Sequence, residues 1–492
     1  MSRCNALTLN EYVPSVSMPW DTQRAHHFYR RVAYGASPTV LSDALTKTPS
    51  DLVDALILEA QSRPDVQDPG WGNWGLGTFL NDYRDTFGID ISISVDTSRY
   101  VQNMYYQEVL DYKLRGKLLQ FWYNHFVSFG NTIPPTYSFQ KYQTYAKYLI
   151  GNFKEFVSAV GRDSKMLVFL NGLQNKATAS NENYARELYE LFTLGVDNGY
   201  TEQDIQETAR ALTGYNRRDD SWQSIYFNEA TFDSSEKTIF GCTGNWGYDD
   251  VIDILFEEKG LLIAQYICTK LYKFFVSPDV NSDIINELAV YFVAHNFEIA
   301  PLLSKLFKSE HFMNSINYGT CIKSPQDLIF GMVKDVDMDF SPDRDDNYNL
   351  FKVYRSRFAG LEGGVFTFPN VAGWPGDEAW LSSVTILQRW EQAYNMVWYQ
   401  RVFNNPFWVN FLKNTFAIDT PVEVVVKGLV DHFLTKPMSS ELEYQNAIGA
   451  FKEGVPDIYF TDGTWDLTYT GVQNQILNLL KYIVKLPEFQ LS

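Results

Sequence analysis

The sequence predicts a mainly α-helical fold, one large helical domain that carries small β-hairpin insertions. Three observations support this prediction. Apolar residues recur at helical spacing through most of the 492 residues, strand signals are short and local, and no fixed-period repeat or low-complexity tract divides the chain. Hydrophobic residues make up 45% of the chain and aromatic residues 16%, which indicates a globular protein with a large core.

Helix starts are marked by capping residues in the N-terminal part. Ser37 followed by Pro38 predicts one start, because serine caps free amide groups and proline suits the first helical position. A second helix is expected from about Ser50. A long helix is expected over 97–129, and a further helical stretch over 139–160. The long helix has an apolar stripe that consists of Val101, Met104, Leu110, Leu114, Leu118 and Trp122.

A short charged helix is expected over 180–195, with the sequence SNENYARELYELFTLG. Its last residue, Gly195, suits the position that follows a helix. Thr201 predicts the start of the next helix, because Asp204 stands three residues later as a capping-box partner. Gly214 closes that helix.

Two β-hairpins are expected as insertions. The first pairs 224–228 with 236–241, and the second lies within 458–469, where the sequence alternates around the turn dipeptide Asp462-Gly463. For the domain organisation we expect a tail over 1–23, a main helical domain over 24–403, and a C-terminal helical portion over 404–492. This last portion is expected to pack on the same body.

Charge and hydropathy exclude several classes of partner. The net charge of −18 makes the chain acidic and argues against a nucleic-acid partner. No stretch reaches the ~18 consecutive apolar residues that a membrane span needs. The first twenty residues show no basic region followed by an apolar one, so they do not predict a signal peptide.

The standard sequence motifs for catalysis and cofactor binding do not assign an activity or a cofactor to this chain. GWGNWG over 70–75 satisfies GxGxxG, but it follows RPDVQDP in place of a strand, and two tryptophans would crowd a pyrophosphate. GxxxxGK[ST], HExxH and GxSxG are absent from the sequence. The four cysteines form no CxxC pair and are expected to be buried or free thiols: Cys4, Cys242, Cys268 and Cys321. The sequence therefore predicts no metal centre and no cofactor.

Several motifs occur in an order that is typical of one family: AHHFYRRVAYGASP, FWYNHF, GRDSKMLVFLN, NENYARELYELFTLG, YTEQDIQETARALTGY, IKSP, PNVAGWPG and LPEFQL. With them the chain resembles, over 24–492, the bacterial family catalogued as domain of unknown function 1800. Members of this family often look exported and are often encoded beside a sulfatase-like family. The resemblance implies a cell-envelope or extracellular location and a sulfatase-like protein as a partner. The aromatic residues of the chain make a glycan or further copies of the chain alternative partners.

The chain departs from the family pattern at three positions. Tyr123 replaces the first histidine of FWHNHF and leaves His125 alone, Asn171 stands where the aspartate of YLDN would be, and Phe232 replaces the histidine before Asp233. Each replacement removes a metal ligand or a proton carrier. The departures therefore favour a binding or assembly protein over an enzyme.

The charged helix carries Asn183, Arg186, Glu187 and Glu190 on one face, because these residues are spaced by three, four and seven positions. As a structural face, it would pair Arg186 with Glu190, and Arg210 of the next helix with Glu187. As a catalytic face, it would use the two glutamates as general base and general acid of a glycoside hydrolase. Both carboxylates then sit on one helix, so a third acid, Asp163 or Asp233, is expected to assist.

Three further residues have two interpretations each. His125 is a satisfied core histidine or a catalytic group. Trp374 is a buried plug or a platform on which a sugar ring stacks. Lys323 caps a helix or contacts an anion.

Two function classes follow from these residues. The first is a binding or assembly protein that engages a glycan, a partner protein or itself, with Asn183, Arg186, Arg210, Trp374 and Lys323 as binding residues. The alternative is a carboxylate-dependent hydrolase that acts on a glycan or another polymer, with Glu187, Glu190, His125 and Asp233 as catalytic residues.

Overall fold

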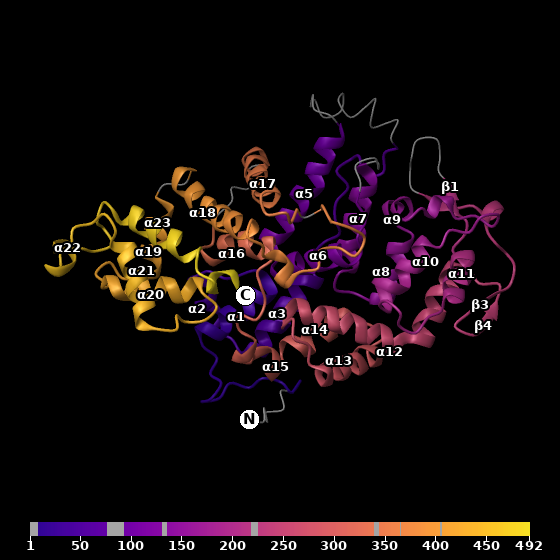
Figure 1. Cartoon of the computed structure of the whole chain (residues 1–492), viewed down its shortest axis with the longest axis horizontal. Helices are drawn as coiled ribbons and strands as arrows, with labels where there is room; N and C mark the ends of the chain where they lie inside the picture. The colour runs from indigo at the N-terminus through magenta and orange to yellow at the C-terminus, as the bar shows by residue number, and fades with distance from the viewer. Residues whose placement is uncertain are drawn as a thin grey trace.

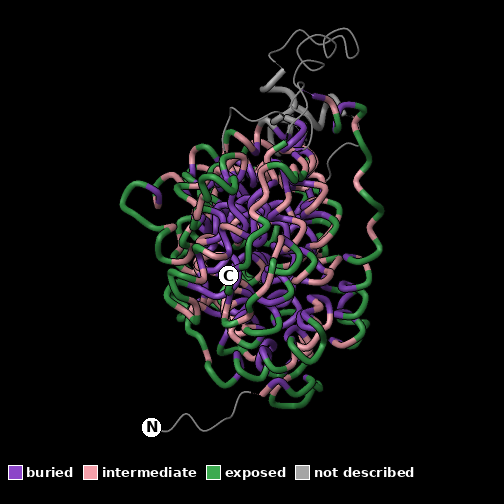
Figure 2. The backbone as a smooth tube through the Cα atoms, turned by 90° about the vertical axis from the view of Figure 1, so that its right-hand side faces the viewer, coloured by how far each residue is buried: buried purple, intermediate pink, exposed green. Residues whose placement is uncertain are grey.

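The computed structural model of the chain describes residues 8–75, 93–129, 135–217, 225–338, 344–364, 366–403 and 406–492. These residues form a mainly helical body, as the sequence predicts. The N-terminal helices lie in the middle of the molecule, with the helices from the centre of the sequence on one side and the C-terminal helices on the other (Figure 1). The buried residues lie inside this body and are continuous along it (Figure 2).

The central group of helices comes from the first third of the chain. It consists of α1 (Thr22–Ala33), α2 (Pro38–Ala44), α3 (Pro49–Gln61), α5 (Ile93–Asp111), α6 (Lys113–His125) and α7 (Pro135–Tyr148). Ser37 caps α2 through its side chain, as predicted, and Thr48 caps α3.

The predicted long helix over 97–129 is two helices. The chain leaves helical geometry at Tyr112, between α5 and α6, and α6 then packs back against α5. A side chain at Gly116 would place its Cβ 2.7 Å from the Cα of Val109, so the glycine allows the two helices to approach closely. The apolar period continues through the break, which is why periodicity does not reveal it.

A second group of helices follows on one side of the centre. It consists of α8 (Phe153–Gly161), α9 (Ser164–Phe169), α10 (Asn183–Glu187), α11 (Glu202–Ala211), α12 (Tyr248–Phe275), α13 (Ser282–Ala294), α14 (Ile299–Phe307) and α15 (Glu310–Met313). The stretch predicted over 139–160 is divided between α7 and α8, since Asn152 caps a new helix there. The capping box of Thr201 and Asp204 is confirmed.

The charged helix ends in an unusual turn. After α10 the chain continues as a π-helical segment, Leu188–Thr193, and Gly195 then adopts a φ of +98°. Two carbonyl groups near this end accept hydrogen bonds from other helices: the hydroxyl of Tyr266 donates to Leu191, and Nε2 of His125 donates to Phe192.

The third group lies on the opposite side and reaches the C-terminus. It consists of α16 (Pro325–Asp335), α17 (Arg344–Ala359), α18 (Thr385–Phe403), α19 (Phe407–Thr415), α20 (Val422–Phe433), α21 (Glu441–Lys452), α22 (Ile458–Thr461) and α23 (Val472–Ile483). The predicted domain division at residue 404 falls outside the described residues and stays a prediction.

The strands differ from the predicted pairs. β1 (Tyr215–Arg217) pairs antiparallel with β2 (Tyr226–Phe227), and β3 (Lys237–Ile239) pairs with β4 (Cys242–Gly244). The prediction that 224–228 pairs with 236–241 is therefore wrong. Phe240 and Gly241 both have positive φ, 49° and 84°, and form a tight two-residue turn. Strand β3 therefore pairs with the adjacent β4 and not with β2.

The predicted hairpin over 458–469 is also wrong. The short helix α22 occupies its start, and Asp462-Gly463 forms the turn that ends this helix. The Asp462 carboxylate accepts a hydrogen bond from the backbone amide of Thr464, and Trp465 then enters the core. The alternation of apolar and polar residues over 458–469 therefore reflects which side chains are buried, and it does not indicate a strand.

Helix α1 connects the side groups to the centre. Ten of its twelve residues are buried, including two adjacent arginines. Arg30 donates hydrogen bonds to the carbonyl groups of His432 and Leu434 at the end of α20, and Arg31 donates to those of Phe274 and Phe275 at the end of α12. Each arginine therefore caps the C-terminal end of a distant helix.

Within the described residues, none of the helices combines the length and apolar character that a bilayer span requires.

Candidate functional site

A cavity of about 500 Å³ lies between α6, α12, the start of α16 and the loop over 366–380. Aromatic and cationic side chains dominate its wall. The aromatic ones include Phe121, Phe274, Phe368, Trp374 and Trp380, and the cationic ones are Arg31, Lys270 and Lys273. Two of the predicted site residues, His125 and Trp374, belong to this lining.

Two helices present one face each to the cavity. Helix α6 contributes Gln120, Phe121, Asn124 and His125, and helix α12 contributes Lys270, Lys273 and Phe274. Residues that are spaced by three and four positions lie on one helix face. Each helix therefore brings one phenylalanine ring together with polar side chains.

The loop over 366–380 is fixed to α6 by a side-chain amide. Asn124 donates from Nδ2 to the carbonyl of Trp374, 3.0 Å away, and accepts at Oδ1 from the Trp374 amide, 2.7 Å away. A Cβ at Gly373, which has a φ of +79°, would lie 2.6 Å from the Asn124 carbonyl oxygen. The glycine is thus needed for this close contact.

Trp374 is a partly exposed ring and not a buried plug. Its Nε1 donates to the carbonyl of Thr367, 2.9 Å away. The ring lies 5.3 Å from that of Trp380, centre to centre, at an interplanar angle of 38°. The two indoles form an aromatic wall on the loop side of the cavity.

His125 is a buried and neutral imidazole with one free ring nitrogen. Its Nε2 lies 3.1 Å from the Phe192 carbonyl oxygen and must donate to it, so Nδ1 carries the lone pair. No described group contacts Nδ1 by a hydrogen bond. Burial lowers the pKa of His125 well below its usual value, and the charge of Lys270 lowers it further.

Lys270 contributes a cation to the same wall. Burial lowers the pKa of its ammonium group to about 8. Its Nζ lies 5.2 Å from the ring centre of Tyr266, and no carboxylate of the described residues pairs with it. Lys270 is thus a cationic donor in the cavity that the described part of the protein leaves without a polar partner, whereas Nδ1 of His125 is itself buried.

The charged face of α10 is a surface ion-pair network. Arg186 pairs with Glu182 at 3.1 Å, with Glu190 at 3.4 Å and with Glu202 of α11 at 2.8 Å. The predicted Arg186–Glu190 pair is confirmed. Asn183 is exposed at the start of α10, where its amide donates to Asn181.

The predicted pair of Arg210 with Glu187 is wrong. Arg210 lies at the end of α11 and binds Glu207 at 2.7 Å and Asp233 at 2.9 Å, because the loop that carries Asp233 folds over this helix end. Glu187 is partly buried and has no ion-pair partner among the described residues. Burial raises the pKa of its carboxyl group, and the nearby Glu190 raises it further.

Neither Glu187, Glu190 nor Asp233 lines the 500 Å³ cavity, so the structure separates the predicted carboxylates from His125 and Trp374. Asp163 is the buried cap of α9 and accepts from the amides of Lys165 and Met166. Burial raises its pKa to about 6.

Lys323 is buried beside the C-terminal segment. Its Nζ lies 4.1 Å from the ring centre of Phe489, and its amide donates to the carbonyl of Gln490. Burial lowers its pKa to about 7, and the nearby Arg30 lowers it further. Ser324 and not Lys323 caps α16.

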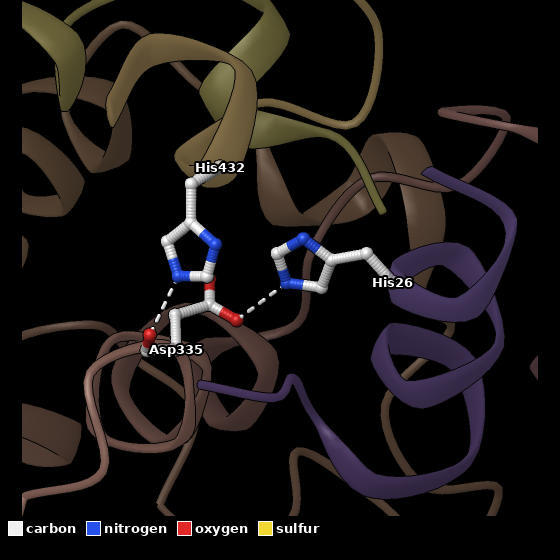
Figure 3. A group of neighbouring side chains, drawn as sticks. All are labelled: His26, Asp335 and His432. Carbon is white, nitrogen blue, oxygen red and sulfur yellow. Dashed lines mark hydrogen bonds and ion pairs between the residues drawn. The ribbon is translucent and has the colours of Figure 1, made fainter. Parts of the chain in front are cut away.

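A cluster that the sequence does not suggest consists of His26, Asp335 and His432, the His–Asp–His cluster (Figure 3). Its members come from α1, α16 and α20 and are separated by 309 and 97 residues. Nε2 of His26 lies 2.9 Å from Oδ1 of Asp335. The expectation of no metal centre depended on ligand spacing, and spacing contains no information on groups this far apart.

The fold and the cavity together define a large helical protein with an internal site of mixed aromatic and polar character. Residues 27–491 match the model of a family described as a protein of unknown function, DUF1800, and the chain therefore belongs to this family. No curated protein and no solved structure matches the chain. The location, the sulfatase-like partner and the self-association inferred from the resemblance stay predictions.

Proposed function

We propose that the protein binds a carbohydrate in the cavity between α6 and α12. The observation that carries this proposal is the combination of Lys270 with the indole rings of Trp374 and Trp380 in one cavity. Lys270 offers N–H donors that no carboxylate of the described residues takes up. A hydroxyl oxygen of a sugar accepts such a hydrogen bond.

The opposite side of the cavity suits the apolar face of a sugar ring. Trp374 and Trp380 present their indole rings on the loop that Asn124 fixes. Aromatic rings with one polar edge pack against ligands that are apolar on one face and polar at the rim. The volume of about 500 Å³ lies within the usual range of small-molecule sites.

Binding is favoured over hydrolysis by the carboxylates of the cavity. Glycoside hydrolysis requires two carboxyl groups on either side of the scissile bond. The cavity carboxylates are Asp327, which is bound to Lys117 and Ser324, and Asp377, which accepts from the amide of Ile322. Both are held by the protein, and Glu187 and Glu190 lie outside the cavity lining.

Titration of the purified chain with soluble oligosaccharides of varied composition, followed by tryptophan fluorescence and calorimetry, tests this proposal. We expect saturable binding that Trp374→Ala weakens at least about tenfold, since the variant removes a stacking surface. The matched control is Trp398→Ala, because Trp398 is an exposed tryptophan of α18 outside the cavity lining.

Lys270→Gln should also weaken binding, while Lys259→Gln should not. Lys259 is the matched control on the same helix, where it packs on the ring of Phe240. Binding that is equal in all four variants contradicts the proposed site. Release of new reducing ends by the wild-type protein would instead support the hydrolase.

A further inference from the structure

We infer that the His–Asp–His cluster binds one divalent transition-metal ion such as Zn²⁺, Co²⁺, Mn²⁺ or Fe²⁺. This site is separate from the carbohydrate cavity and does not depend on that proposal. Two imidazoles and one carboxylate are the ligand set that such ions accept when they keep positions open for water.

The ligand atoms of the cluster are close enough to share one ion. One coordinating atom from each residue lies within 4.8 Å of the other two, and the His26–Asp335 pair is separated by 2.9 Å. Ligand atoms that are adjacent around one ion with bonds of about 2.0–2.2 Å lie about 3.0–3.5 Å apart. The first pair already approaches this spacing, and a closer approach of the His432 ring, whose centre lies 4.8 Å from that of His26, completes the set.

Hydrogen bonds to the protein prepare His432 and Asp335 as ligands. Nε2 of His432 lies 2.6 Å from the backbone carbonyl oxygen of Asp335 and donates to it, so the lone pair stands on Nδ1, the nitrogen on the side of His26 (Figure 3). A ligating histidine usually donates its other N–H in this way. The amide of Ala36 donates to Oδ1 of Asp335 at 3.2 Å and orients the carboxylate.

The tautomer of His26 has to change when an ion binds. Without an ion, Nε2 of His26 donates to Oδ1 of Asp335 and therefore carries the proton. Nε2 becomes a ligand once this proton has moved to Nδ1, because only an unprotonated ring nitrogen binds a metal ion.

A second cavity gives an ion access to the cluster. It has a volume of about 390 Å³ and is lined by His26, Arg30, Asp431 and His432, among others. Arg30 lies 3.9 Å from Oδ2 of Asp335 and repels a cation, but its terminal nitrogens are held by the carbonyl groups of Leu434 and His432. We therefore expect weaker binding than at a closed four-ligand zinc site.

Cobalt(II) titration of the full chain, after treatment with a chelator, tests the inference. We expect one Co²⁺ per chain with visible absorption bands and displacement of Co²⁺ by Zn²⁺. His26→Gln and His432→Gln each remove one ligand while an amide N–H can still donate to Asp335, and each should weaken binding at least about tenfold.

The matched control is His27→Gln. His27 is the neighbouring buried histidine of α1, its Nε2 contacts the carbonyl of Phe312, and it does not belong to the cluster. Its variant should bind Co²⁺ like the wild type. Circular dichroism of each variant establishes that it is folded.

A measurement on the wild type keeps the test independent of variant folding. Zn²⁺ that binds the folded chain raises its melting temperature progressively with the free ion concentration. Absence of this rise, or one bound Co²⁺ retained in both folded glutamine variants, would overturn the inference.

Discussion

Two ion-pair centres of this protein have opposite composition and opposite exposure. Arg186 on α10 is one cation among three carboxylates, and its side chain is 33% exposed while that of Glu202 is 66% exposed. Glu108 on α5 is one carboxylate between Arg63 and Arg115, and its side chain is fully buried. The first centre is conspicuous in the sequence as a charged helix face, whereas the second is not.

The comparison teaches that the ion pairs that are conspicuous in the sequence are not the ones that contribute most to stability. Water screens the Arg186 network, and exposed ion pairs of this kind contribute little to stability. Glu108 also accepts from the Tyr142 hydroxyl at 3.3 Å, while Arg115 donates to the carbonyl groups of Ala60 and Ala146. This buried centre therefore joins α3, α5, α6 and α7.

The largest effect is expected from Glu108→Gln. The substitution leaves the buried guanidinium of Arg115 and the partly exposed one of Arg63 without their counter-charge, which we expect to lower the free energy of unfolding by about 3–5 kcal/mol. Chemical denaturation of wild type and variant measures the difference. A loss below about 1 kcal/mol would place Glu108 in the same class as the surface network.

The second-largest effect is expected from acid, which should destabilise the folded chain through its buried histidines. Burial lowers the pKa of His311 to about 4 and that of His125 well below its usual value, so these rings stay neutral in the folded chain. The unfolded chain takes up these protons near pH ~6.5. Stability is therefore complete above about pH 6.5 and is lost as the pH falls towards the folded-state values.

The expected loss between about pH 6.5 and 4.5 is about 2 kcal/mol for each of these two histidines. Asp163 acts in the opposite sense, because burial raises its pKa to about 6 and the folded state then holds its proton more tightly. Denaturation curves across this pH interval at constant ionic strength measure the net effect. A free energy of unfolding that does not change across this interval would show that the two histidines take up protons in the folded protein.

Glu187→Gln tests a carboxylate that is intermediate between the exposed Arg186 network and the buried Glu108 centre. Glu187 is partly buried beside Glu190 and lacks an ion-pair partner among the described residues. Removing its charge relieves desolvation and repulsion, so we expect stability that is unchanged or higher by up to about 1 kcal/mol. Thermal melts of the wild type and the variant test this expectation. A clearly lower melting temperature of the variant would reveal a cation partner for Glu187.

The smallest effect is expected from Glu202→Gln. Arg186 keeps Glu182 and Glu190 after this change, and all of these groups are accessible to solvent. We expect no measurable shift of the melting temperature at physiological ionic strength, because salt screens exposed pairs. A shift as large as that of Glu108→Gln would remove the distinction between the two centres.

Local signals were sufficient for the helical class and for several helix starts. Ser37, Thr201 and Asp204 act through neighbours three residues away, so their roles are readable in the sequence. The break at Tyr112 is not predicted, because the apolar period continues through it and the close approach at Gly116 is a tertiary contact. The hairpin predicted over 458–469 failed because buried side chains imitate strand alternation.

The candidate sites were predictable only in part. His125 and Trp374 could be selected as residue types, but Asn124 and Trp374 meet across 250 residues, and the spacing of the chain gives no sign of this contact. Lys270 occupies an ordinary position on the long helix α12, and the His–Asp–His cluster joins three separate segments. Such sites arise from tertiary packing, which a single sequence does not display.

The arginine caps of α1 have a consequence for how the chain folds. Arg31 reaches carbonyl groups 244 residues further along the chain, and Arg30 reaches one that is 404 residues further. Contacts of such sequence separation form slowly, because the intervening chain must lose its freedom before they are made. Helix α1 should therefore dock late during refolding.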